Sequence, residues 1–153
     1  MVYLREALVK DAAKLSEIAI RSKAHWGYDQ RFIQQCKQDL TITVDYINQH
    51  HVFVLDSGEQ IIGFFTFLRD KEDCLDFLYI DPTFIGKGYG RLLWKDVIEK
   101  ARELEIKRFT IDSDPHAKGF YEKMGAIQIA EVPSTVFENR MLPLMEYTFE
   151  DSI

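Results

Sequence analysis

The sequence predicts a mixed α/β domain in which helices cover a central sheet. Three observations lead to this prediction: apolar residues recur at helical spacing in several stretches, β-rich apolar runs fill the middle of the chain, and the two kinds of segment do not alternate regularly. The irregular order argues against a doubly wound parallel sheet. A length of 153 residues is typical of one domain with a sizeable core, so we treat 1–153 as a single domain.

The first third of the chain predicts a short strand followed by helices. Residues 2–6 have the pattern of a strand. Asp11 stands where a side chain caps a helix, and apolar residues then recur at helical spacing until Gly27 interrupts them. We expect a second helix over about 29–37 and a third over 43–50.

The middle of the chain predicts a hairpin and a third strand. The runs 52–55 and 61–68 are rich in branched and aromatic residues, and the residues between them have turn chemistry. The next run, 74–80, has the same composition. We expect it to end at Asp81 and Pro82, because proline cannot donate a hydrogen bond to a strand ladder.

The second half predicts a long helix, a strand, a short helix and two final strands. The long helix follows a glycine-rich segment and extends to about Leu104, with its apolar residues on one face. We expect the later elements at 108–112 (strand), from Asp114-Pro115 to Gly125 (helix), and at 126–132 and 145–149 (strands), with Pro133 and Pro143 in the loop between the last two.

Composition excludes some classes of function. The chain has 19 Lys and Arg against 25 Asp and Glu, a net charge of −6, which argues against a broad nucleic-acid surface. No apolar run approaches the ~18 residues of a membrane span, and the charged first residues do not have the apolar stretch of a signal peptide. Cys36 and Cys74 form no metal motif or disulfide framework. We therefore expect a cytoplasmic protein with reduced thiols, no metal and no membrane partner.

The segment FIGKGYGRLL (84–93) is the first candidate for a binding site. Gly86, Gly88 and Gly90 follow a predicted strand and open a predicted helix, so their N–H groups can turn toward one point. The helix N-terminus adds about half a positive charge, and Lys87 and Arg91 add full charges. This arrangement suits an anion such as a pyrophosphate. A tight turn that begins a helix explains the same glycines equally well.

Two common nucleotide motifs do not fit the segment. A phosphate P-loop requires Gly-Lys followed by Ser or Thr, whereas Lys87 here precedes Gly88. A dinucleotide fingerprint requires a third glycine where Arg91 stands, although Asp112 follows at about the distance that this motif requires. A dinucleotide-dependent oxidoreductase therefore stays a weaker alternative.

The stretch DFLYIDPTFIGKGYGRLLW (76–94), followed by DSDPHAKGFYEKMGA (112–126), resembles the GNAT superfamily of N-acetyltransferases. The acetyl-CoA motif of this family is Arg or Gln, two residues, Gly, one residue, then Gly or Ala. Gly88 and Gly90 match its last two positions, and Ile85 replaces the first. A second family motif, Asn-x-x-Ala-x-x-Phe-Tyr ending in Gly-Phe, is matched by Asp114, Ala117, Phe120, Tyr121, Gly125 and Ala126, with Asp in place of Asn and Ala in place of Phe.

The resemblance implies a mostly antiparallel mixed sheet of six to seven strands flanked by helices, with a V-shaped splay between the fourth and fifth strands. It also implies acetyl-CoA as co-substrate, with the pantetheine arm along the splayed strand and the pyrophosphate on the glycine segment. The cofactor-binding residues it implies are Leu78, Ile80, Ile85, Gly86, Lys87, Gly88, Gly90, Arg91, Asp114 and Phe120.

The resemblance assigns catalytic roles to two residues. Tyr121 matches the family tyrosine that protonates the departing CoA sulfur, although a core aromatic is the plainer interpretation. Asp76 alternates with Leu78 and Ile80, so we expect it on their face, where a carboxylate among apolar neighbours can act as the base. A solvated carboxylate, or a partner for an arginine, is the alternative for Asp76.

Fewer features of the sequence indicate which residues bind the acetyl acceptor. The resemblance places His25, Trp26 and Tyr28, around Gly27, at the acceptor pocket, where aromatic rings can hold a cationic amine. Arg140 lies in a loop from which it can reach an acceptor carboxylate. A surface arginine is the plainer interpretation of Arg140, and packing in a core or loop is the plainer one for His25 and Trp26. We expect transfer of an acetyl group to a primary amine of a small molecule or a protein, and dimers are frequent in the family. A non-catalytic acyl-CoA-binding sensor is the alternative, because Ile85 and Asp114 depart from the family pattern.

Overall fold

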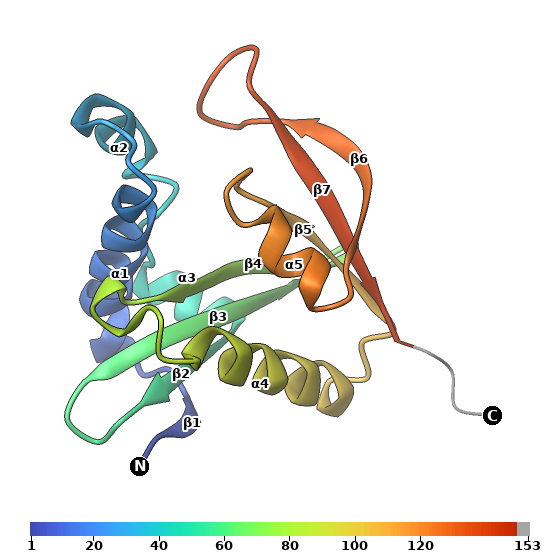
Figure 1. Ribbon diagram of the computed structural model, residues 1–153. Helices are drawn as coiled ribbons and strands as arrows, with labels where there is room; N and C mark the ends of the chain where they lie inside the picture. Colours follow the sequence, from blue (N-terminus) through green and yellow to red (C-terminus); the bar gives the residue numbers. More distant parts are fainter. Residues whose placement is uncertain (150–153) are drawn as a thin grey trace.

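The computed structural model describes residues 1–149, which form a seven-stranded sheet with helices on both faces (Figure 1). The strands lie in the order β1-β2-β3-β4-β5-β7-β6. Their bounds are β1 Tyr3–Glu6, β2 His51–Asp56, β3 Ile61–Arg69, β4 Asp73–Ile80, β5 Arg108–Asp112, β6 Ile127–Pro133 and β7 Met141–Thr148. The helices are α1 Ala12–His25, α2 Gln30–Cys36, α3 Val44–Gln49, α4 Tyr89–Glu103 and α5 Lys118–Lys123, with short 3-10 helices η1 Val9–Asp11 and η2 Pro82–Phe84.

The sheet is mixed, with one parallel pair between β4 and β5 and antiparallel pairs elsewhere. The parallel pair joins the strands only where Cys74 is opposite Thr110. Beyond this point β4 and β5 diverge toward their carboxyl ends. The predicted order of elements and the splay between the fourth and fifth strands are therefore confirmed.

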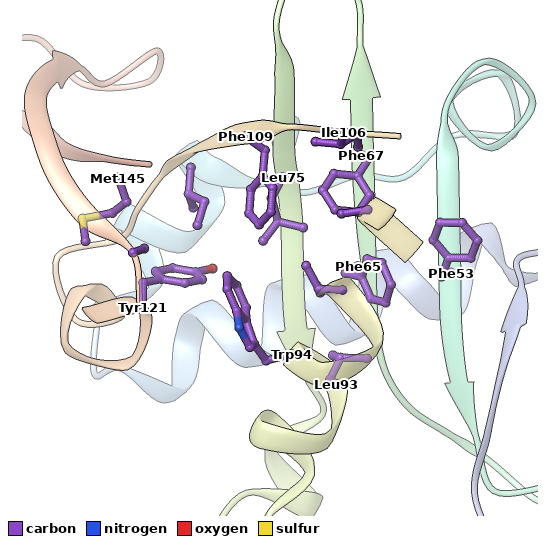
Figure 2. Packing of buried hydrophobic residues seen from close by; sticks show 14 of the residues in the cluster. Phe53, Phe65, Phe67, Leu75, Leu93, Trp94, Ile106, Phe109, Tyr121 and Met145 are labelled. Atoms are coloured by element: carbon purple, nitrogen blue, oxygen red, sulfur yellow. The ribbon is translucent and has the colours of Figure 1, made fainter. Parts of the chain in front are cut away.

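Two hydrophobic cores cover the two faces of the sheet. The first core lies between the sheet and helices α4 and α5, and it includes Phe65, Phe67, Trp94, Phe109 and Tyr121. Figure 2 shows these rings packed side by side across the sheet. The second core lies under helices α1, α2 and α3 on the opposite face. Because both faces are buried, the centre of β2 is apolar throughout, and the buried part of β3 is apolar except for Thr66.

A β-bulge interrupts the pairing of β3 with β4. Thr66 is opposite Phe77 and Phe67 is opposite Leu75, so Asp76 has no partner in β3. The extra residue sends Leu75 into the first core and Phe77 into the second. The regular alternation assumed for this strand is therefore wrong at Asp76, which lies at the bend where β4 begins to leave β5.

The role predicted for Asp11 is corrected by the structure. Its side chain does not cap α1, because the helical path begins one turn earlier with η1 and Asp11 already has helical dihedral angles. Its carboxylate instead accepts from the N–H of Leu8 at 2.8 Å. It also pairs with Arg5 of β1, at 2.8 Å between Nη1 and Oδ2.

The loop predicted to contain Pro133 and Pro143 is shorter than expected, because β6 ends with Pro133 and β7 begins at Met141 and includes Pro143. Pro143 is opposite Glu131 of β6, beyond Asp112, where the pairing with β5 ends. Its C=O accepts from the N–H of Ser113. Its nitrogen faces the same side, away from β6, so the proline removes no ladder hydrogen bond.

Among residues 1–149, no helix combines the length and the apolar character that crossing a bilayer requires.

Candidate active site

A cavity of about 270 Å³ occupies the opening between β4 and β5. Ten of the residues proposed from the sequence line it: His25, Trp26, Asp76, Leu78, Ile80, Ile85, Gly90, Asp114, Phe120 and Tyr121. The wall also contains residues that the sequence did not single out for this site, namely Ser22, Lys23, Leu75, Tyr79, Leu93, Ile111, Asp112 and Ala117. The splay thus brings the proposed cofactor and acceptor regions to one cavity.

The backbone of β4 faces this opening at Leu78 and Ile80. The N–H groups of Phe77 and Asp81 both bond toward β3, to the Thr66 side chain and to the Ile62 carbonyl. Since backbone groups alternate sides along a strand, those of Leu78 and Ile80 point toward β5, which has already diverged. The Ser22 hydroxyl donates to the Ile80 C=O at 2.5 Å. The exposed groups therefore match the prediction, except that the carbonyl of Ile80 already has a partner.

The glycine segment lies at the start of α4, where Ile85 and Gly90 line the cavity and Gly86 and Gly88 do not. Gly86 and Gly88 have φ of 84° and 85°, in the left-handed region that favours glycine. Gly88 is the residue before α4 and has no side chain to cap the first turn. The first amides of a helix have no partner inside it, so these N–H groups are available to an anion. A side chain added at Gly86 or Gly88 would meet nothing within 4 Å, which leaves open space in front of the backbone.

Position 90 requires a small residue for a different reason, the close approach of two helices. A Cβ on this residue would lie 3.4 Å from the ring of Phe120. The small residue therefore lets α4 approach α5, which carries Phe120 and Tyr121. Lys87 lies over the ring of Phe84 at 5.8 Å, and neither Lys87 nor Arg91 lines the cavity.

Tyr121 is 6% exposed and packs beside Trp94, with ring centroids 5.9 Å apart. Figure 2 shows its oxygen directed away from its own helix. Burial raises the pKa of this phenol well above its usual value, and the nearby charges of Asp114 and Cys74 act in the same direction. The hydroxyl is therefore held protonated at the cavity, as a proton donor requires.

Asp76 reaches the cavity from the bulge in β4. Its Oδ2 accepts a hydrogen bond from the Tyr46 hydroxyl of α3 at 2.5 Å. Burial raises the pKa of this carboxyl, and the Tyr46 hydrogen bond opposes that increase. Asp76 thus lines the same cavity as Leu78 and Ile80, but its carboxylate is bound to the helix that covers the second core and does not share their face as predicted.

Asp112 is a second carboxylate at the opening, placed at the carboxyl end of β5. Burial raises its pKa, and its charge raises the pKa of Asp76. The sequence pointed to Asp112 only through the incomplete dinucleotide motif. Its position at the end of a strand next to the predicted splay was the signal that could have identified it.

Asp114 does not stand free for a cofactor. Its Oδ2 pairs with Lys23 of α1 at 2.5 Å, and its Oδ1 accepts from the N–H of His116 at 2.8 Å. Burial tends to raise the pKa of this carboxyl, but the Lys23 and His116 hydrogen bonds hold it below its usual range. Asp114 therefore joins α1 to the segment that leads into α5.

The remaining acceptor-side residues form a wall around this ion pair. Trp26 stacks on His116 with ring centroids 5.2 Å apart. The Tyr28 hydroxyl lies 3.0 Å from Asp114 Oδ2 and accepts from Arg140 at 2.8 Å, and burial together with Asp114 raises its pKa to about 12. Tyr28 and Arg140 thus support Asp114 from behind and do not line the cavity. The described part of the chain contains no cluster of metal-ligating side chains.

An open parallel pair in the sheet, free amides at a helix N-terminus beside it and a buried phenol in the opening define an acyltransferase fold. The chain belongs to the GNAT acetyltransferase family, because residues 9–148 match the family described as "Acetyltransferase (GNAT) domain".

Individual relatives are distant. The uncharacterised protein YxbD of Bacillus subtilis is 28% identical over 104 residues, which are 66% of this chain and 61% of that protein. The chain therefore matches about three fifths of the length of that relative. A GCN5-related N-acetyltransferase of Rhodopseudomonas palustris has a TM-score of 0.79 at 17% identity, over 96% of this chain and 95% of the other. The PaiA N-acetyltransferase of Thermoplasma acidophilum, solved with coenzyme A, has a TM-score of 0.77 at 16% identity, over 97% and 99%.

Proposed function

We propose that the protein transfers an acetyl group from acetyl-CoA directly to a primary amine of a small molecule or a protein. One observation carries this proposal: the buried Tyr121 phenol and the unpaired backbone of β4 reach the same cavity. A thioester laid along β4 would place its sulfur where a proton donor is needed.

Acetyl-CoA fits the residues around the opening. The pantetheine arm would pair with the exposed groups of Leu78 and Ile80, as an added strand does. The pyrophosphate would lie on the amides from Gly86 to Arg91, where the open space in front of Gly86 and Gly88 admits it. Lys87 and Arg91 would add positive charge beside it.

Two side chains serve the chemistry. Asp76 takes a proton from the attacking ammonium, whose nitrogen then bonds to the acetyl carbon. The C–S bond breaks as the tetrahedral intermediate collapses, and Tyr121 gives its proton to the departing sulfur. The nitrogen, now bonded to the acetyl carbon, loses a second proton, which restores the Tyr121 phenol and leaves a neutral amide. The raised pKa of each group fits its role, because a base must hold a proton briefly and an acid must stay protonated until the bond breaks.

The acceptor would enter from the side of α1 and the β6–β7 loop. Trp26 and His25 line this side, and Asp76 and Asp112 supply two carboxylates with no lysine or arginine among the described residues in ion-pair contact with them. A cationic amine is the acceptor that such a wall attracts.

Calorimetric titration with acetyl-CoA tests the cofactor assignment, with NADH and ATP as controls. We expect micromolar binding of acetyl-CoA and no heat from either control. Heat from NADH alone would favour the oxidoreductase alternative and reject the proposal. An acceptor screen that measures release of free CoA thiol then tests the transfer itself. Binding of acetyl-CoA without turnover of any amine would favour the non-catalytic sensor.

A further inference from the structure

We propose that Tyr46 is a positioning residue for the reaction, which holds the Asp76 carboxylate in its ionised form and in a fixed orientation at the cavity. This inference rests on the proposed function, in which Asp76 is the base. Tyr46 lies on α3, outside the segments that resemble the family motifs, and it does not line the cavity.

The contacts form a chain of three hydrogen bonds. The N–H of Phe77 donates to Thr66 Oγ1 at 3.1 Å, Thr66 Oγ1 lies 2.8 Å from the Tyr46 hydroxyl, and that hydroxyl lies 2.5 Å from Asp76 Oδ2. Thr66 is completely buried. The ring of Tyr46 packs edge-on against Phe77, with centroids 5.7 Å apart, which holds the hydroxyl in place.

The chain of donors has one consistent direction. An amide N–H can only donate, so Thr66 Oγ1 accepts at one end, and its own proton is directed to Tyr46. Tyr46 then donates to Asp76 Oδ2, and a donated hydrogen bond of this kind is stronger when the accepting carboxyl is ionised. If Asp76 were protonated and donated to Tyr46, Tyr46 would donate to Thr66, and the buried Thr66 proton would lose its acceptor. The geometry thus favours the carboxylate over the acid.

The hydrogen-bond chain also links two consecutive residues at the β-bulge. Phe77 lies opposite Thr66 and Asp76 is the unpaired residue before it, and the hydrogen bonds run from the backbone of Phe77 to the side chain of Asp76. A carboxylate at a bulge has no neighbouring strand to fix its direction. Tyr46 supplies that direction from the facing helix.

The hydrogen bond from Tyr46 matters because few other groups near Asp76 stabilise its negative charge. Asp112 of β5 and Asp39, between α2 and α3, both raise the pKa of Asp76, whereas His50, after α3, lowers it. No lysine or arginine within residues 1–149 forms an ion pair with Asp76. The Tyr46 hydroxyl is therefore the main contact that opposes burial of this charge.

Tyr46→Phe tests the inference by two readouts. The first is the titration of the Asp76 carboxyl carbon by NMR in the free protein, assigned by its disappearance in Asp76→Asn. Loss of one hydrogen bond to a charged group should raise this pKa by about one unit. The second is the pH profile of kcat/KM for an acceptor found in the screen, whose acidic limb should move to higher pH by the same amount. Tyr3→Phe is the control, because Tyr3 is also a phenol beside a carboxylate, Asp56, but lies in the edge strand β1 and does not line the cavity.

An unchanged Asp76 titration in a folded Tyr46→Phe protein would overturn the inference. So would a shifted titration with an unchanged acidic limb, since Asp76 would then not be the base. Because the NMR titration needs neither acetyl-CoA nor an acceptor, it stays informative if the proposed function fails. If Tyr46→Phe does not fold, Thr66→Val tests the same chain from its middle, and a smaller shift in the same direction is expected.

Discussion

Cys74 and Thr110 face each other at the one point where the parallel strands β4 and β5 pair within residues 1–149. Every residue of β4 after this point has lost its neighbour on that side. The bulge at Asp76 follows two residues later and bends the strand away. The cavity, the free backbone of β4 and the placement of Asp76 all follow from this divergence.

Tyr121→Phe should lower turnover by about a hundredfold or more, because it removes a general acid without changing the shape of the ring. Release of free CoA thiol measures this loss, and calorimetry should show unchanged binding of acetyl-CoA. Wild-type turnover in this variant, with any acceptor, would remove Tyr121 from the mechanism.

Gly88→Val should weaken acetyl-CoA binding by about tenfold or more, a loss worth about 1.4 kcal/mol or more. Its φ of 85° is strained for a branched residue, and the new side chain would fill the open space before the amides. Gly58→Val is the matched control, since Gly58 has φ of 90° and also meets nothing within 4 Å, but lies in the β2–β3 turn. Both variants should lose similar stability, and only Gly88→Val should lose affinity. Equal affinities in the two folded variants would contradict the anion site.

Gly63→Ala should lower the free energy of unfolding by about 1–3 kcal/mol. An added Cβ would lie 2.6 Å from the carbonyl oxygen of Tyr79 and 2.8 Å from the side chain of Ile80. Gly119→Ala is the control, because a Cβ there meets nothing within 4 Å. Urea unfolding compares the two, and equal stabilities would show that β3 and β4 can separate without cost.

Asp114→Asn should destabilise the protein at pH 7 and much less in acid, although it restores the residue type of the family motif. The pKa of Asp114 is held below its ordinary value of 3.8. Its stabilising contribution is therefore present above that value and is lost as the pH falls through the lower, folded-state pKa. Loss of the charged hydrogen bond from Lys23 predicts a difference of about 1–3 kcal/mol at pH 7.

Urea unfolding of wild type and Asp114→Asn from pH 7 down to about pH 2 measures how their free energies of unfolding approach each other as the pH falls. Asp70→Asn, at an exposed turn, should change little at any pH. If the difference in the free energy of unfolding between wild type and Asp114→Asn stays constant as the pH falls, the ion pair is not its cause.

The order of elements could be predicted because it depends on local patterns. The apolar runs of β2 and β3 and the glycine before α4 identify their structures without reference to the rest of the chain. The splay between β4 and β5 was predicted from the family resemblance, because no pattern within the strands shows where two neighbouring strands separate. Pro143 was misplaced because proline is acceptable in a strand once its neighbour has ended, which depends on the length of β5.

The site was predicted less completely, since side-chain pairing is a matter of three-dimensional distance. Asp114 and Lys23 are 91 residues apart in sequence, and Tyr46 and Asp76 are 30 apart. No spacing rule connects such pairs. The motif residues Ile85, Gly90, Asp114, Phe120 and Tyr121 line the cavity, whereas Gly86, Lys87, Gly88 and Arg91 do not. The hydrogen-bond partners of Asp114 and Asp76 came from helices α1 and α3, which carry no motif.

The splay places a bare strand edge in the middle of the sheet instead of at its border. Edges with unpaired backbone groups are the places where chains add strands to one another and begin to aggregate. Here the surrounding elements shield that edge from other chains but leave it open to a slender ligand. The protein should therefore resist aggregation best when a ligand fills the gap, because the bound ligand then occupies the backbone groups that another strand would use.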